Sequence, residues 1–194
     1  MKKIKLIVAV LTAFTMMFVV TACGAAGEGA GTANPVHESD INEVADKTGI
    51  YMTTPVGATE IKFSYIEVTD EEPIAQVTFK YNGNEFCYRA QKNDYTNILD
   101  VTEGDADLAD MIESLNDGTN IVASLSGMHY EWKASAFTEV KGKDGLVAFN
   151  NNKEGIIGWI DLDRSPSILY SISMTSGATQ EILQNLATEI YSPM

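Results

Sequence analysis

The chain predicts an α+β fold, with one antiparallel β-sheet of about six to eight strands and a C-terminal amphipathic helix packed on one face. Two observations support this prediction. Short runs of alternating apolar and polar residues are separated by turn-forming residues, which is typical of antiparallel strands. Two other stretches place apolar residues three and four positions apart, which is the spacing of a helix with one buried side.

The first 22 residues have the features of an export signal. Three of the first five residues are lysines, and residues 6–22 are apolar except for three threonines. The segment ends in Val20-Thr21-Ala22 directly before Cys23, and this closely resembles the lipobox of a bacterial lipoprotein. The resemblance implies that residues 1–22 are a signal peptide and that Cys23 receives a diacylglycerol and becomes the mature N-terminus.

A plain secretory signal and an uncleaved membrane helix are the alternative interpretations of this segment. The apolar stretch is slightly shorter than the roughly 20 residues that span a bilayer, and residues 24–33 carry no cationic cluster that would stop transfer. Two acyl chains give stable membrane attachment, whereas one is marginal. We therefore expect a protein anchored by lipid on the extracytoplasmic face of the cell membrane.

Residues 23–46 are predicted to be the lipidated N-terminus and a flexible tether. Gly and Ala dominate residues 24–33, and Asn34-Pro35 interrupts regular structure. The charges of Glu38, Asp40, Glu43 and Asp46 are expected to keep the segment solvated. The remaining residues, 47–194, have a common size for one domain with one core.

Strands are predicted through most of this domain. Asn82-Gly83 is the sharpest signal, because both residues tolerate the positive φ of a two-residue hairpin turn. The predicted strands cover residues 61–68, 75–81, 86–90, 130–137, 145–149, 156–161 and 168–174.

Two helices are predicted from the apolar spacing. A short one covers residues 105–116, where Leu108, Met111, Ile112 and Leu115 share one side. A C-terminal helix has an apolar stripe that ends at Ile190, with Ser176 or Thr179 as its N-cap. This stripe must be buried, and one face of the sheet is the natural place.

The charge is strongly acidic. The formal net charge is −14, and it becomes −17 once residues 1–22, which contain three lysines and no acid, are removed. This argues against a nucleic-acid partner and against flat adsorption on anionic lipids. Solubility explains the charge, with cation binding as the alternative.

The cysteines do not predict a disulfide. There are two, Cys23 and Cys87, and lipid on Cys23 would leave Cys87 without a partner. Cys87 lies in a strand-like run, where a small buried residue is the simpler interpretation. A reactive thiol needs a cationic, partly exposed setting, for which Arg89 is the single indication.

Catalytic and metal signatures are weak, so we predict no catalytic residues, no cofactor and no metal site. The two histidines, His37 and His129, are too few for a typical zinc site, and no Gly-x-Ser-x-Gly motif is present. Calcium is the remaining alternative. Its candidate ligands are Asp105, Asp107, Asp110 and Glu113, or the pair Asp161 and Asp163, but the loop glycine of a calcium motif is missing.

Arg89, Trp132 and Trp159 are the candidate binding residues. Exposed tryptophans can stack on sugars or bind peptides, although core packing is the more common role. Arg89, one of two arginines, could bind an anion or pair with a carboxylate of this acidic chain.

Several short motifs together resemble a known group of proteins. They include the lipobox, Thr54-Pro55-Val56-Gly57-Ala58, the 74–79 strand with its hairpin, Gly158-Trp159-Ile160 and the closing helix. The chain is similar to uncharacterised extracytoplasmic lipoproteins of Gram-positive bacteria that carry a domain of unknown function. Some related domains occur on sensor-like or anti-sigma-type proteins, so the resemblance implies sensing or partner binding.

The expected function is therefore non-enzymatic binding or sensing of a protein, peptide or envelope component at the membrane surface. A small-ligand or calcium-binding module is the alternative, and a structural envelope spacer is the third possibility.

Overall fold

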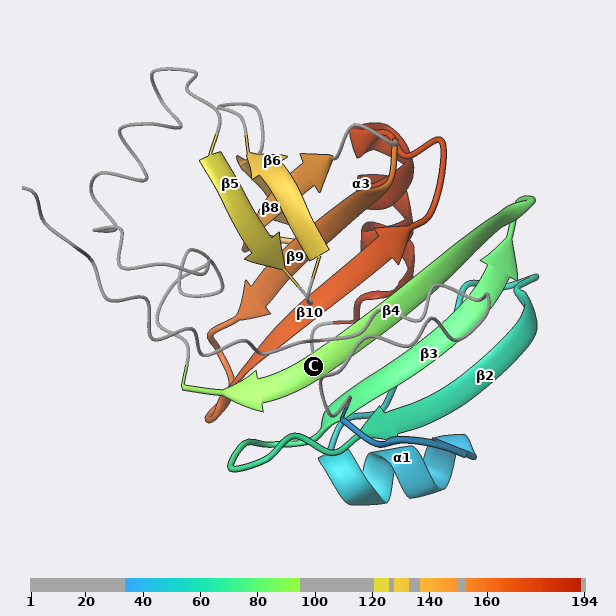
Figure 1. Cartoon of the computed structure of the whole chain (residues 1–194), viewed down its shortest axis with the longest axis vertical. Helices are drawn as coiled ribbons and strands as arrows, with labels where there is room; N and C mark the ends of the chain where they lie inside the picture. The colour runs from blue at the N-terminus through green and yellow to red at the C-terminus, as the bar shows by residue number, and fades with distance from the viewer. Residues whose placement is uncertain (1–33, 95–120, 126–127, 133–136, 150–152, 193–194) are drawn as a thin grey trace, which may run out of the picture.

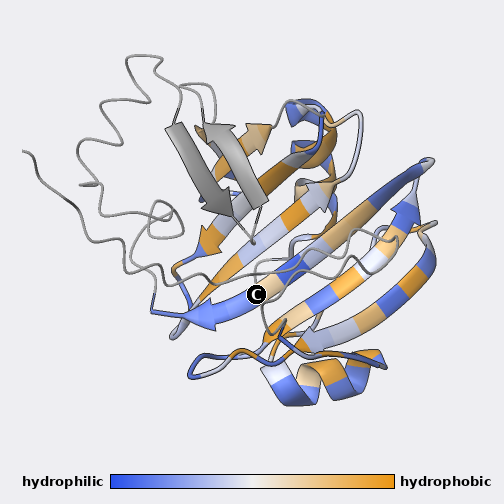
Figure 2. Cartoon of the chain, viewed as in Figure 1, coloured by the Kyte–Doolittle hydropathy of each residue, from blue (hydrophilic) through white to orange (hydrophobic). Residues whose placement is uncertain are grey.

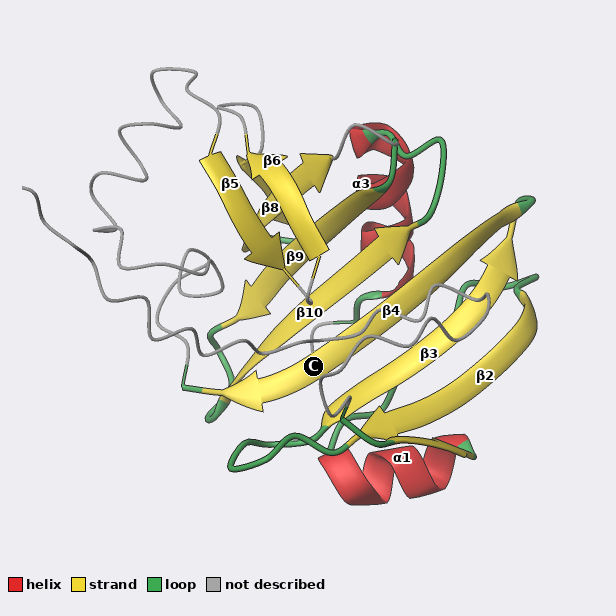
Figure 3. Cartoon of the chain, viewed as in Figure 1, coloured by secondary structure: helices red, strands yellow, loops and turns green. Residues whose placement is uncertain are grey.

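The computed structural model describes residues 34–94, 121–125, 128–132, 137–149 and 153–192 (Figure 1). The described strands form one antiparallel sheet with helices packed against it, which confirms the predicted α+β class (Figure 3). The predicted helix at residues 105–116 lies outside the described residues. Among the helices that are described, none is long and apolar enough to cross a membrane.

The ten described strands follow the order β1-β2-β3-β4-β10-β9-β8-β6-β5, and β7 pairs with β8 beside this path. The central pairing joins β4 to β10 antiparallel, from Phe86 opposite Met174 to Asn93 opposite Ser167. The strands are β1 (Val36–Ser39), β2 (Thr59–Ile66), β3 (Ile74–Tyr81), β4 (Asn84–Asn93), β5 (Ile121–Leu125), β6 (Met128–Trp132), β7 (Phe137–Val140), β8 (Lys143–Phe149), β9 (Gly155–Asp161) and β10 (Ser167–Met174). The sheet is wider than predicted because β1 and β5 are additional, and β6 and β7 occupy the region predicted as one strand.

The hairpin between β3 and β4 confirms the turn prediction. Asn82 and Gly83 both adopt positive φ, 49° and 79°, and Tyr81 pairs with Asn84 across the turn. Two consecutive left-handed residues match the right-handed twist of the flanking strands.

The tether prediction is wrong at its C-terminal end, because the folded domain begins before residue 47. β1 pairs with β2, and α1 (Ile41–Thr48) follows directly. Asp40, which we interpreted as a solvating charge, caps α1: its Oδ1 accepts hydrogen bonds from Asn42 N and Glu43 N at 2.8 and 3.0 Å. Gly49, with φ 64°, ends the helix in the left-handed conformation.

The C-terminal helix, α3 (Gln180–Ile190), agrees with the prediction. Thr179 is its N-cap, and its side chain accepts a hydrogen bond from Ile182 N at 3.2 Å. The buried side carries Leu183, Leu186, Ala187 and Ile190. This side packs against β9, β10 and β7.

One face of the sheet, here called the core face, holds the apolar core. Hydropathy alternates along β2, β3 and β4 (Figure 2), as expected when one face is buried. Val77, Tyr88, Trp159 and Ile172 on the core face belong to the same buried cluster as residues of both helices. The two helices therefore cover one face, and the ends of α1 and α3 are brought to the same part of the core.

Candidate functional site

A buried carboxylate, Asp161, organises the most polar part of the core face. It is the last residue of β9, it pairs with Ile168 at the start of β10, and it is 2% exposed. Arg164 lies three residues after Asp161 in the loop between β9 and β10, and this loop brings its side chain back to the end of β9. A buried carboxylate requires charged or hydrogen-bonding partners, since desolvating it alone is costly.

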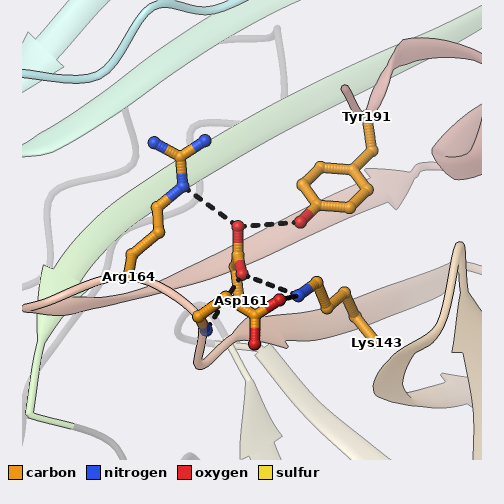
Figure 4. Close-up of polar contacts among 5 residues, drawn as sticks. Lys143, Asp161, Arg164 and Tyr191 are labelled. Carbon is orange, nitrogen blue, oxygen red and sulfur yellow. Dashed lines mark hydrogen bonds and ion pairs between the residues drawn. The ribbon is translucent and has the colours of Figure 1, made fainter. Parts of the chain in front are cut away.

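Both oxygens of Asp161 are fully engaged (Figure 4). Oδ1 contacts Lys143 Nζ at 3.0 Å and accepts the backbone N–H of Asp163 at 3.2 Å. Oδ2 accepts Arg164 Nε at 3.0 Å and the Tyr191 hydroxyl at 2.8 Å. Four donors from three separate segments therefore meet on one carboxylate.

These contacts hold Asp161 ionised. Burial raises the pKa of its carboxyl, but the hydrogen bonds from Lys143, Tyr191 and Arg164 outweigh that effect, and the pKa lies below its ordinary value. An ionised carboxylate with no spare acceptor position is a structural anchor rather than a base.

A pocket of about 340 Å³ lies beside this carboxylate. Its lining comes from the segment after α1, from the core face of β4 and β10, from Arg164 and from the end of α3. Representative lining residues are Tyr51, Tyr88, Arg164, Ile168, Tyr170 and Tyr191. We call this cavity the tyrosine pocket.

The tyrosines of the pocket are part of a stacked aromatic group. Tyr170 lies 5.4 Å from Trp159, 6.2 Å from Tyr88 and 5.2 Å from Tyr191, measured between ring centroids. Such packing restricts the rings. The wall of the tyrosine pocket is therefore preformed.

The phenols remain protonated. Burial raises the pKa of Tyr88 and the pKa of Tyr170. At Tyr170, the positive charge of Arg164 lowers the pKa and the negative charge of Asp161 raises it, but burial has the largest effect. No described residue hydrogen-bonds to the hydroxyl of Tyr88 or of Tyr170. Both can therefore donate to a ligand.

Two backbone carbonyl acceptors beside the tyrosine pocket already have donors. Thr53 Oγ1 donates to Ile190 O at 2.8 Å, and Lys141 Nζ donates to Tyr191 O at 2.5 Å. Arg164 contacts Asp161 through Nε, and its two terminal nitrogens point away from that carboxylate (Figure 4). The polar groups left to the pocket are thus mainly donors.

A second cation lies near the rim of the tyrosine pocket. Lys92 of β4 pairs with the lining residue Ile168. A Cβ added to Gly49, another lining residue, would lie 2.1 Å from Lys92 Nζ. Arg164 and Lys92 thus place positive charge beside the pocket in a chain with a formal net charge of −14.

The structure does not bring the predicted binding residues together. Trp159 is completely buried on the core face behind the tyrosine pocket. Arg89 is 7% exposed on the opposite face, where its Nε donates to Gln76 Oε1 at 2.8 Å. Trp132 lies in β6, and its side chain is outside the described part of the structure.

Cys87 lies on the same face as Arg89 rather than in the apolar core. Its thiol is 3.5 Å from Gln76 Oε1. Burial raises its pKa, although Arg89 opposes this, so the thiol stays protonated. The predicted core position is therefore wrong, because Cys87 is half-buried on the face opposite the core, while the protonated thiol fits an unreactive residue.

The proposed calcium ligands Asp161 and Asp163 have other partners. Lys143 Nζ contacts both carboxylates, and Asp161 also accepts from Arg164 and Tyr191. Over the described residues, no group of three His, Cys, Asp or Glu side chains is placed to hold a metal ion. Asp105, Asp107, Asp110 and Glu113 lie outside those residues.

The chain matches no protein-family model, no curated protein and no solved structure.

The sequence indicated Asp161 only as a possible calcium ligand, and it did not predict that Lys143, Asp161, Arg164 and Tyr191 form one site. One local signal was present: an acidic residue ends an apolar strand and an arginine follows three positions later. Nothing local indicates that Lys143 and Tyr191 reach the same carboxylate.

Proposed function

We propose that this protein is a lipid-anchored binding domain outside the cytoplasm, which takes a ligand into the tyrosine pocket without chemically changing it. One observation carries the binding role: the pocket combines a preformed aromatic wall with donors that no described residue satisfies. Concave, mostly apolar sites with a few directed polar groups are typical of ligand binding.

The chemistry of the pocket favours binding over catalysis. Asp161 is ionised but has no free acceptor position, and the phenols are held in their neutral form. General base catalysis needs a base within reach of the substrate proton. Cys87, the nucleophile considered from the sequence, lies on the other face of the sheet with a raised pKa.

The membrane location rests on the sequence. Val20-Thr21-Ala22-Cys23 supports lipid attachment at Cys23, and β1 begins only thirteen residues later, at Val36. The binding domain would therefore remain close to the membrane surface.

Lipid attachment is tested by metabolic labelling with radioactive palmitate, followed by membrane fractionation and by protease treatment of intact cells. We expect the wild-type chain to be labelled, membrane-bound and accessible to protease. Cys23→Ser should lose the label, whereas Cys87→Ser should retain it. Labelling that survives Cys23→Ser would contradict the proposed anchor.

The binding role is tested with a screen of small fragments of mixed charge against full-length protein extracted in mild detergent. Tyr51 is 66% exposed and lines the pocket, so Tyr51→Ala should weaken the fragments that bind there and leave the fold intact. Val56→Ala, at a neighbouring position that is 93% exposed and outside the lining, is the matched control. A screen without any fragment sensitive to Tyr51→Ala would overturn the role.

A further inference from the structure

We infer that the ligand of the tyrosine pocket is a small aromatic carboxylate, whose anionic group binds Arg164 and whose ring packs against the tyrosines. This inference rests on the proposed binding function and specifies the ligand class. It follows from the polarity, the charge and the size of the pocket, taken in turn.

The polarity of the pocket calls for a ligand that accepts hydrogen bonds. Arg164 keeps its terminal nitrogens free of Asp161, and the protonated hydroxyls of Tyr88 and Tyr170 line the same cavity. The neighbouring acceptors, Ile190 O and Tyr191 O, already have donors. A carboxylate supplies two acceptor atoms, and its planar shape matches a guanidinium group.

The local charge also favours an anion. Lys143 contacts both Asp161 and Asp163, so the two cations Lys143 and Arg164 balance these two carboxylates. Lys92 adds a further cation at Gly49. The chain as a whole is acidic, so an anionic ligand should be attracted only by the positive groups at the pocket. This attraction should weaken as the salt concentration rises.

The volume and lining limit the body of the ligand. About 340 Å³ is near the lower end of the roughly 300–1,000 Å³ range of small-molecule pockets, which suits a single ring with a short side chain. Ile168 and Ile190 supply apolar surface, and the rings of Tyr88 and Tyr170 supply flat surface. An aromatic ring in the ligand would be stabilised both by burial against the isoleucines and by stacking on the tyrosine rings.

The inference is tested with matched pairs of an acid and its primary amide: phenylacetate with phenylacetamide, and 4-hydroxyphenylacetate with 4-hydroxyphenylacetamide. Dissociation constants are measured by ligand-observed NMR titration of the detergent-extracted full-length protein. The members of each pair have the same shape and differ in charge. We expect each acid to bind about tenfold more tightly than its amide, in keeping with charge-assisted hydrogen bonds.

Two variants separate the role of Arg164 from general charge. Arg164→Gln should weaken the acids about tenfold and bring them close to the amides. Lys62→Gln removes one positive charge at an exposed position on β2 and should leave both affinities unchanged. Because Arg164→Gln also loses a contact to Asp161, Arg164→Lys is included, with thermal melting to confirm folding. We expect this variant to bind the acids at intermediate strength.

Each outcome bears on the inference. The carboxylate assignment is overturned if acids and amides bind with equal affinity and both are weakened by Tyr51→Ala. It is also overturned if Arg164→Gln leaves the affinity for the acids unchanged. In both cases the proposed binding function still holds. Failure of all four compounds, while other fragments bind the tyrosine pocket, also overturns the assignment alone. Absence of any binder in the pocket overturns both the assignment and the proposed function.

Discussion

The hydroxyl of Tyr191 donates a 2.8 Å hydrogen bond to Oδ2 of Asp161, and this contact joins the end of α3 to the end of β9. The same oxygen accepts Arg164 Nε. Tyr191 also lines the tyrosine pocket. One carboxylate therefore fixes the last helix, a wall of the pocket and the arginine that faces it.

Tyr191→Phe should destabilise the protein by about 1–3 kcal/mol, because a buried hydrogen bond to a charged acceptor is lost while the ring stays in place. Chemical denaturation with urea measures the change. Tyr81→Phe is the control, since its hydroxyl makes a longer, exposed bond of 3.3 Å to Glu189, and we expect a change of about 0.5 kcal/mol or less. Equal effects of the two substitutions would contradict the anchoring role of Tyr191.

Stability should depend on the ionisation of Asp161 in acid. Its folded pKa lies below the ordinary 3.8, so its contribution is complete above that pH and is lost as the pH falls through the folded pKa. The difference in unfolding free energy between wild type and Asp161→Asn should therefore be largest near neutral pH and shrink in acid. Asp46→Asn, at an exposed position of α1, is the control substitution. A difference that stays constant from pH 7 to pH 2 would be inconsistent with this account.

Gly155→Ala should destabilise the start of β9. An added Cβ would lie 2.5 Å from Ala178 Cβ and 2.9 Å from Phe149 Cδ1, so the neighbours must move, at a cost of about 1–3 kcal/mol. Adding Ala178→Gly removes the closest clash and should restore part of the loss in a double-mutant cycle. Thermal melting checks both variants, and a single variant as stable as wild type would show that this packing is not tight.

Thr179→Ala should cost about 1 kcal/mol, because the side chain of Thr179 caps α3 through Ile182 N. Thr179→Ser keeps the hydroxyl and should preserve most of the stability. Urea denaturation distinguishes them, and equal losses from Ala and Ser would argue against the cap.

The parts of the fold that depend on local sequence were predictable. Asn82-Gly83 specifies its own turn, and the stripe ending at Ile190 requires a covered face. α1 was missed because it is only eight residues long and follows Asn34-Pro35, and because Asp40 was taken as a solvating charge instead of a cap. Short helices depend on capping and tertiary packing more than on their own sequence pattern.

The candidate site was not predictable for a different reason. Lys143, Asp161 and Tyr191 belong to three separate segments, and only strand register and the packing of α3 bring them together. Alternation placed Trp159 and Arg89 on strands, but it could not show which face the helices cover. The structure shows that Trp159 is in the core and that Arg89 lies on the other face.

Ligand binding in the tyrosine pocket can be measured by a backbone-amide NMR titration of isotope-labelled protein in detergent with 4-hydroxyphenylacetate. We expect saturable shifts at Thr53, Arg164 and Tyr191, around the tyrosine pocket, with none at Gln76 or Arg89 on the opposite face. These shifts should be strongly reduced in Arg164→Gln. Shifts concentrated on the opposite face, or no saturable shift at all, would contradict the claim that this pocket binds a small aromatic carboxylate.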